Sequence, residues 1–133
     1  MKLSEAIKRG AKQRPKSRDA WFDGKGSCVW AAALEGIDRF PGENLHGYEG
    51  PLLKSLCEQE WPWAFRHVTV HPILGVQGGT QTVADIMFSL NDGFRSWSRE
   101  RIADWVTKIE MEEQQVSGPW VEEKSLFREE VGV

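Results

Sequence analysis

The sequence predicts a small, mainly α-helical single domain (α+β class) with a short β-hairpin or strand pair. Its 133 residues, 40% of them hydrophobic and 28% charged, suit one globular domain with one core. Several segments repeat apolar residues at helical spacing, whereas only the stretch around residues 63–76 alternates like strands. We expect a compact helical domain over residues 1–118 and an acidic tail over residues 119–133, either docked or mobile.

Three helices are expected in the first half of the chain. Ser4 can cap a short basic helix, which Pro15 would end. Ser27 is the candidate N-cap of a second helix, and Gly36 can close it. Pro51 suits the first turn of a third helix.

The second half is expected to hold the strand pair and two further helices. After the strand-like run, residues 77–80 (QGGT) predict a turn. Thr82 can cap a fourth helix, which residues 91–93 (NDG) would stop. Ser98 can start a fifth helix, with apolar residues at helical spacing after it.

Charge is distributed unevenly along the chain, although the net charge is only −3. Residues 1–18 carry seven lysines and arginines against one glutamate, whereas residues 110–133 carry seven glutamates against two basic residues. Two interpretations stay open. Either the two ends neutralise each other in the fold, or one of them is an interaction arm.

The acidic tail leads to the main functional hypothesis. Glutamates interspersed with aromatic side chains can dock on a basic surface of a protein partner. We therefore predict a non-enzymatic binding or regulatory protein that acts through a protein partner; whether it also has an enzymatic activity is uncertain, and we favour none. The candidate partner-binding residues are Glu122, Glu123, Phe127, Glu129 and Glu130.

Nucleic-acid binding is the first alternative. Arg99 and Arg101 lie in the first turn of the expected fifth helix, where cations oppose the helix dipole, and a broken local rule is a mild pointer to function. In helix-turn-helix proteins the second helix of a pair places such residues at its N-terminal end, and the helix pair over residues 82–111 could do the same. The basic N-terminal helix would add to this surface. The candidate residues are Lys8, Arg9, Lys12, Arg95, Arg99 and Arg101.

A small cysteine hydrolase is the second alternative. Cys28 lies at the expected start of a helix, where a thiol pKa can be lowered, and His67 could act as its base. A buried helix-start cysteine is the simpler interpretation. No close pair of metal ligands such as C-x2-C occurs, and the glycine-rich loop over residues 75–80 lacks the lysine of a P-loop, so we predict neither metal nor cofactor.

The N-terminus and the apolar segments bear on localisation. No apolar run approaches the roughly 18 residues of a membrane span, and the N-terminus lacks the apolar region of a signal peptide. We therefore expect a cytoplasmic protein that does not bind membranes, with both cysteines reduced. Its oligomeric state stays open.

Three segments, LSEAIKRGAKQRP, GSCVWAAALEG and LNDGFRSWSRERIADWV, together resemble a family of small, functionally uncharacterised proteins of bacteria and their phages. The resemblance covers most of residues 3–110 and does not reach the acidic tail. Relatives often carry a CPxC-like pair where this chain has HPIL, so only His71 of a metal knuckle is retained. The resemblance implies a bacterial or phage setting, in which a phage-encoded modulator of a host machine is one form of the predicted binding protein.

Overall fold

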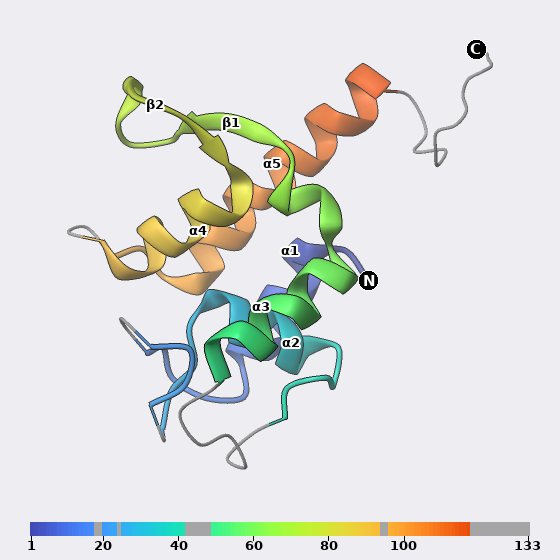
Figure 1. The fold of residues 1–133 in the computed structure, drawn as a ribbon, viewed down its shortest axis with the longest axis vertical. Coiled ribbons are helices and arrows are strands. Elements are labelled where there is room, and N and C mark those ends of the chain that lie inside the picture. Colours follow the sequence, from blue (N-terminus) through green and yellow to red (C-terminus); the bar gives the residue numbers. More distant parts are fainter. Residues whose placement is uncertain (18–19, 24, 42–48, 94–95, 118–133) are drawn as a thin grey trace. The chain divides into compact units, whose positions relative to one another are not determined.

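The computed structural model describes the chain except residues 18–19, 24, 42–48, 94–95 and 118–133 (Figure 1). The chain divides into two compact units, Met1–Ala103 and Asp104–Val133. The helices and strands confirm a mainly α domain with one strand pair. They are α1 (Leu3–Ala11), α2 (Val29–Gly36), α3 (Glu49–Glu60), a 3-10 helix (Pro62–Phe65), β1 (Val68–His71), β2 (Gly75–Thr82), α4 (Val83–Asp92) and α5 (Arg99–Ser117).

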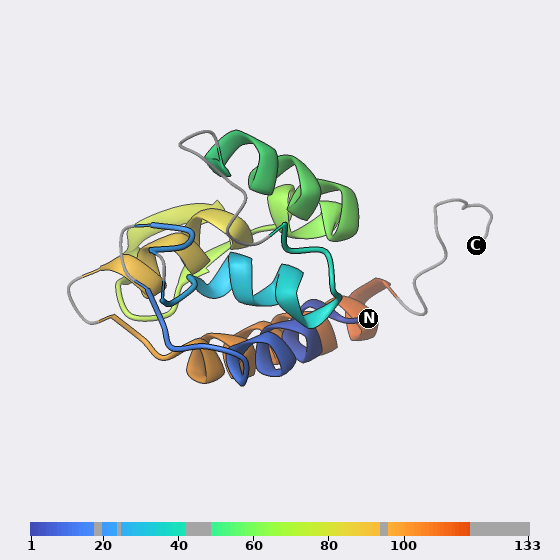
Figure 2. The same cartoon turned by 90° about the horizontal axis from the view of Figure 1, so that it is seen from below.

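Helices α1 and α2 make the closest backbone contact found in the described part of the first unit (Figure 2). A Cβ atom added to Gly10 would lie 1.6 Å from the carbonyl oxygen of Ala32, and one added to Gly36 would lie 2.0 Å from that of Ala6. Each helix thus presents an alanine and a glycine four residues apart, on one face. The order of these contacts makes the two helices antiparallel.

Trp30 of α2 is the largest fully buried side chain of the first unit. Its ring lies 5.0 Å from that of Phe65, 6.2 Å from that of Trp61 and 6.3 Å from that of Phe88, measured between centroids. Aliphatic side chains with no exposed surface complete this core. They include Leu3, Ile7, Leu34, Leu53, Ile86 and Met87.

The second unit is described only over Asp104–Ser117, the later part of α5. Val106 and Ile109, three residues apart, are buried, whereas Met111 is exposed. None of the described helices combines the length and the apolar character that a membrane span requires.

Two of the predicted N-caps are confirmed. The Thr82 hydroxyl accepts a hydrogen bond from the backbone N–H of Asp85 at 3.1 Å at the start of α4. The Ser98 hydroxyl accepts one from the N–H of Arg101 at 3.1 Å at the start of α5. Helix α4 also ends at the predicted stop, with Gly93 as its C-cap.

The other two predicted N-caps are wrong. Helix α1 begins at Leu3, so Ser4 lies inside its first turn and is buried. Helix α2 is capped by the Cys28 sulfur, which accepts from the N–H of Ala31 at 3.5 Å. Ser27 does not cap it because its hydroxyl is bonded within the polar network described below.

The predicted turn at residues 77–80 is also wrong, because these residues belong to strand β2. The chain reverses at residues 72–74 instead. There the Nδ1 atom of His71 accepts hydrogen bonds from the backbone N–H groups of Ile73 at 3.1 Å and Leu74 at 3.2 Å. The strand pair therefore begins later and ends later than the predicted residues 63–76: Pro62–Phe65 form a 3-10 helix, β1 begins at Val68 and β2 ends at Thr82.

The contact between α1 and α2 can be tested by replacing Gly10 with alanine. The new methyl group would overlap a backbone carbonyl that cannot rotate away, so we expect a loss of about 3 kcal/mol in unfolding free energy. Urea denaturation followed by tryptophan fluorescence measures it. Gly50→Ala in α3 is the control, since its Cβ would meet nothing closer than 3.8 Å and helix propensity favours alanine by up to about 1 kcal/mol. Equal stability of the two variants would contradict the contact.

Candidate functional site

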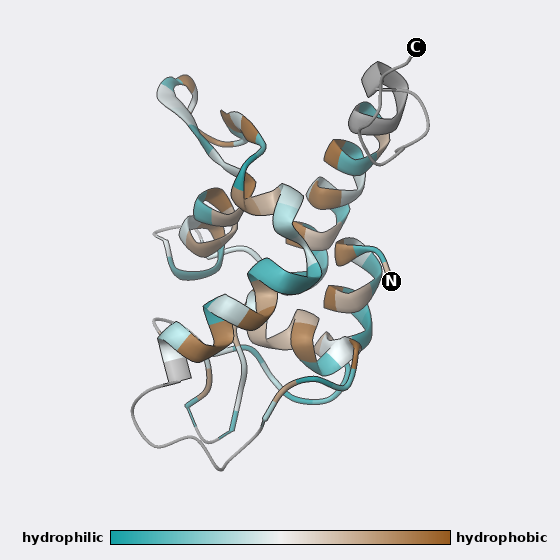
Figure 3. Ribbon diagram, turned by 45° about the vertical axis from the view of Figure 1, so that its right-hand side comes forward, coloured by the Kyte–Doolittle hydropathy of each residue, from teal (hydrophilic) through white to brown (hydrophobic). Residues whose placement is uncertain are grey.

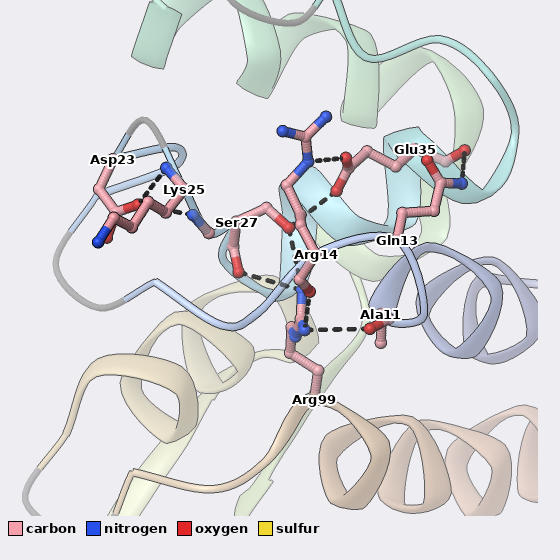
Figure 4. A network of polar contacts seen from close by, with 9 residues as sticks. Ala11, Gln13, Arg14, Asp23, Lys25, Ser27, Glu35 and Arg99 are labelled. Atoms are coloured by element: carbon pink, nitrogen blue, oxygen red, sulfur yellow. Dashed lines mark hydrogen bonds and ion pairs between the residues drawn. The ribbon is translucent and has the colours of Figure 1, made fainter.

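The most buried charged group near the start of α5 is the guanidinium of Arg99, whose residue is only 5% exposed. Its Nη1 atom donates to the carbonyl oxygen of Ser27 at 3.3 Å and to the Ser27 hydroxyl at 3.0 Å. Its Nη2 atom donates to the carbonyl oxygens of Ala11 at 3.2 Å and Arg14 at 2.6 Å (Figure 4). Arg99 therefore satisfies backbone acceptors at and just beyond the C-terminal end of α1.

Glu35 of α2 is the negative group of the same network and is 3% exposed. One of its carboxylate oxygens accepts a hydrogen bond from the Ser27 hydroxyl at 2.8 Å, and the other pairs with Nε of Arg14. The Ser27 hydroxyl thus lies between the guanidinium of Arg99 and the carboxylate of Glu35. Burial lowers the pKa of Arg99, and the charges of Glu100 and Glu35 act in the opposite direction.

Asn91 forms a second polar junction, at the end of α4, and is fully buried. Its Oδ1 atom accepts from the backbone N–H of Val29 at 3.0 Å, and its Nδ2 atom donates to the carbonyl oxygen of Ser17 at 3.1 Å. One amide side chain therefore links α4 to the start of α2 and to the loop before it. The side chains of both polar junctions form hydrogen bonds with backbone groups and therefore stabilise the fold.

The residues predicted to bind nucleic acid lie in different environments. Arg99 is buried and its donors are engaged by the protein, so it cannot reach a phosphate. Arg101 is exposed, and its guanidinium carbon lies 3.9 Å from the ring centroid of Trp97. Arg95 lies outside the described residues. Three further candidates are exposed, Lys8 and Arg9 on α1 and Lys12 directly after it.

Cys28 lies at a helix start, as expected, but its environment opposes nucleophilic chemistry. It is 3% exposed, and burial raises the pKa of its thiol to about 12, a larger effect than the hydrogen bonds from the N–H groups of Ala31 and Trp30. Burial raises the pKa of the Cys57 thiol as well. Among the described residues, no three histidine, cysteine, aspartate or glutamate side chains are grouped closely enough to hold a metal ion.

The hairpin of β1 and β2 has a composition unlike that of the rest of the chain. Residues 67–84 include no aspartate, glutamate, lysine or arginine, although these types make up 28% of the whole sequence. Five aliphatic side chains of this hairpin are nevertheless exposed, and brown, apolar segments lie along it in Figure 3. We call them the hairpin surface: Val68 (56% exposed), Val70 (37%), Ile73 (36%), Leu74 (57%) and Val76 (85%).

Strand register assigns the side chains of the hairpin to two faces. Val68 lies opposite Thr82, and Val70 lies opposite Thr80. Because side chains alternate along a strand, these four β-branched residues share one face. The other face carries Gln81 and the buried His71.

A pocket of about 360 Å³ lies between this second face, the end of α4 and the segment that leads to α5. Its apolar walls come from Ile73, Leu74, Leu90 and Trp97. Polar groups of His71, Gln81, Ser89 and Ser96 also line it. The pocket lies wholly within the first unit.

No known protein-family model, curated protein or solved structure matches this chain. The resemblance to small bacterial and phage proteins therefore stays a prediction. The acidic residues predicted to bind a partner all lie outside the described part of the chain, so the tail hypothesis also stays a prediction. The sequence interpretation missed the hairpin surface, although the absence of charge over residues 67–84 was a readable signal.

Replacing Arg99 by methionine tests the buried network. The substitution removes the donor from the carbonyls of Ala11 and Arg14 and removes a cation that compensates Glu35, so we expect roughly 3–5 kcal/mol lower unfolding free energy. Arg101→Met is the matched control two residues away. It loses an exposed cation–π contact and should lower stability by only about 0.5–1 kcal/mol. Urea denaturation measures the unfolding free energy of both variants, and similar losses would contradict a central role of Arg99 in the buried network.

Cys28 is expected to be unreactive in the folded protein. At pH 7.5 a thiol with a pKa near 12 has about a thousandfold less thiolate than one at the ordinary value of 9.0, and thiolate is the reacting form. Iodoacetamide labelling of a Cys57→Ser variant reports on Cys28 alone. We expect labelling to become fast only when urea unfolds the protein. Rapid labelling of the native state would restore the cysteine hydrolase hypothesis.

Proposed function

We propose that this protein is a non-enzymatic binding protein that docks a protein partner through the hairpin surface. The observation that carries the proposal is the group of five exposed aliphatic side chains on a hairpin without any charged residue. Exposed apolar side chains that gather on one element are typical of interaction sites on proteins.

The composition of the hairpin favours burial by a partner. Fully burying an exposed aliphatic side chain contributes about 1.5–3 kcal/mol, and no charge on this segment would have to be desolvated. Natural edge strands are usually protected by lysines, other charges or prolines that prevent pairing with another chain. Strand β2 contains none of these residues.

The backbone register identifies the form of partner that fits. Pairing shifts from Val70 opposite Thr80 to His71 opposite Gly75, so residues 76–79 of β2 have no partner residue in β1. The described sheet contains only these two strands. The irregular residues 76–79 lie next to the regular part of β2, residues 80–82, whose edge away from β1 faces no other strand of the described sheet. The partner we propose presents an uncharged extended segment with apolar side chains to this hairpin.

The proposal keeps three expectations drawn from the sequence and changes one. It keeps a cytoplasmic location, a regulatory role through a protein partner and a bacterial or phage setting. It moves the primary docking surface from the acidic tail to the hairpin. The tail glutamates are then a second contact, suited to a basic region of the same partner.

Direct nucleic-acid binding is the second candidate. It is supported by the exposed basic residues Lys8 and Arg9 on α1 and Lys12 directly after it. It is the weaker candidate because Arg99 is buried and the net charge of the chain is −3. If proteins that co-purify with this chain from an extract of the native host are lost after nuclease treatment, nucleic-acid binding is favoured.

The docking proposal is tested with the full chain carrying Val68→Lys and Val70→Lys. The two lysines lie on the hairpin face that also carries Thr80 and Thr82. They introduce charges that a docked apolar segment would have to desolvate, so we expect at least tenfold weaker binding to the partner. A photo-crosslinking residue at position 76, which is 85% exposed, identifies the partner in an extract of the native host. Binding of the purified partner is then measured by calorimetry.

Two further variants make this test specific. Leu52→Lys is the matched control, because Leu52 is 46% exposed but lies on α3, and its binding should be unchanged. Replacing Glu122, Glu123, Glu129 and Glu130 by glutamine tests the tail. If that variant loses binding while the double-lysine variant keeps it, the hairpin proposal fails. A stable dimer of the free protein that the double-lysine variant abolishes would also overturn it, because the surface would then be occupied by a second copy.

A further inference from the structure

We infer that the pocket beside the hairpin surface receives one tyrosine side chain of the docked partner, an inference that rests on the proposed function. The pocket and the hairpin surface are continuous, since Ile73 and Leu74 belong to both. An extended segment lying along the hairpin therefore has a pocket within reach of a side chain. Interfaces commonly bury a few aromatic anchors in such pockets.

The pocket is large enough to hold an aromatic ring. Its volume of about 360 Å³ is at the lower end of the range for pockets that hold small organic molecules, about 300–1,000 Å³. The wall is preformed, because Leu90 is 2% and Trp97 is 8% exposed. The guanidinium of Arg101 lies over the Trp97 ring and restrains it further.

Polar groups on the wall select an aromatic ring that carries a hydroxyl. His71 lines the pocket, and because its Nδ1 accepts two backbone hydrogen bonds, Nε2 is the ring nitrogen that can donate. The side chains of Gln81 and Ser89 can both donate and accept. A tyrosine hydroxyl can accept from a donor and donate to an acceptor, whereas phenylalanine offers these side chains no hydrogen bond.

The inference is tested with amino-acid probes in solution. The full chain is labelled at isoleucine δ-methyl groups, and the Ile73 methyl reports on the pocket while the buried Ile7 methyl serves as reference. N-acetyltyrosinamide should shift the Ile73 signal and bind about fivefold more tightly than N-acetylphenylalaninamide, the effect of one net hydrogen bond. N-acetylalaninamide should have no effect.

A matched pair of variants assigns the binding to the pocket. Ser89 is an exposed residue of α4 that lines the pocket, so Ser89→Leu fills the space without disturbing the core. Ser55→Leu makes the same change at an exposed position of α3 that does not line it. We expect N-acetyltyrosinamide binding to be lost in the first variant and kept in the second. Gln81→Leu, on the opposite wall, gives a second filling variant with the same expectation.

The outcomes separate this inference from the docking proposal. If Ser89→Leu leaves partner binding unchanged while the double-lysine variant abolishes it, the pocket inference fails and the docking proposal stands. If p-cresol binds but the blocked tyrosine amide does not, the pocket holds a free small molecule, and the partner side chain is ruled out. Equal affinity for the tyrosine and phenylalanine amides would overturn the choice of tyrosine.

Discussion

The buried guanidinium of Arg99 is the interaction on which the rest of the first unit depends. It binds carbonyl groups of Ala11, Arg14 and Ser27, and so joins the end of α1, the loop that follows and the segment before α2 to the start of α5. A cation in the first turn of a helix opposes the helix dipole by a few tenths of a kcal/mol. Several hydrogen bonds to buried acceptors outweigh that effect, and only the planar fork of arginine can make them together.

The sequence predicts what is decided locally and misses what is decided by distant partners. Thr82 and Ser98 were recognisable as caps because a hydroxyl bonds to an N–H three residues later. Arg99 was recognisable as an exception to the dipole rule, but its partners lie 72 to 88 residues earlier, so burial could not be foreseen. Ser27 satisfied the local rule for a cap, yet its hydroxyl is held by Arg99 and Glu35.

Glycines show the same division. Gly36 was predicted to end a helix, and α2 does end there, but its lack of a side chain also permits the contact with α1. The glycines of residues 77–80 led to the prediction of a turn there, whereas the chain reverses at residues 72–74. Gly79, with φ of +75°, and Gly78, whose Cβ would lie 2.6 Å from that of Leu74, accommodate an irregular strand instead. The observed turn is marked in the sequence by Pro72 and by Gly75, whose φ is +58°, and it is held by the imidazole of His71.

The hairpin surface differs from these structural features because folding gains little from it. Val76 is 85% and Leu74 is 57% exposed, so polar or charged residues there would leave the described core contacts intact. Stability therefore does not explain why a chain with 28% charged residues places none of them between residues 67 and 84. The docking that we propose accounts for it, since an uncharged apolar surface contributes free energy only when another molecule covers it. The charged ends of the chain cannot form ion pairs with such a surface, so the docking proposal requires a partner segment of apolar character.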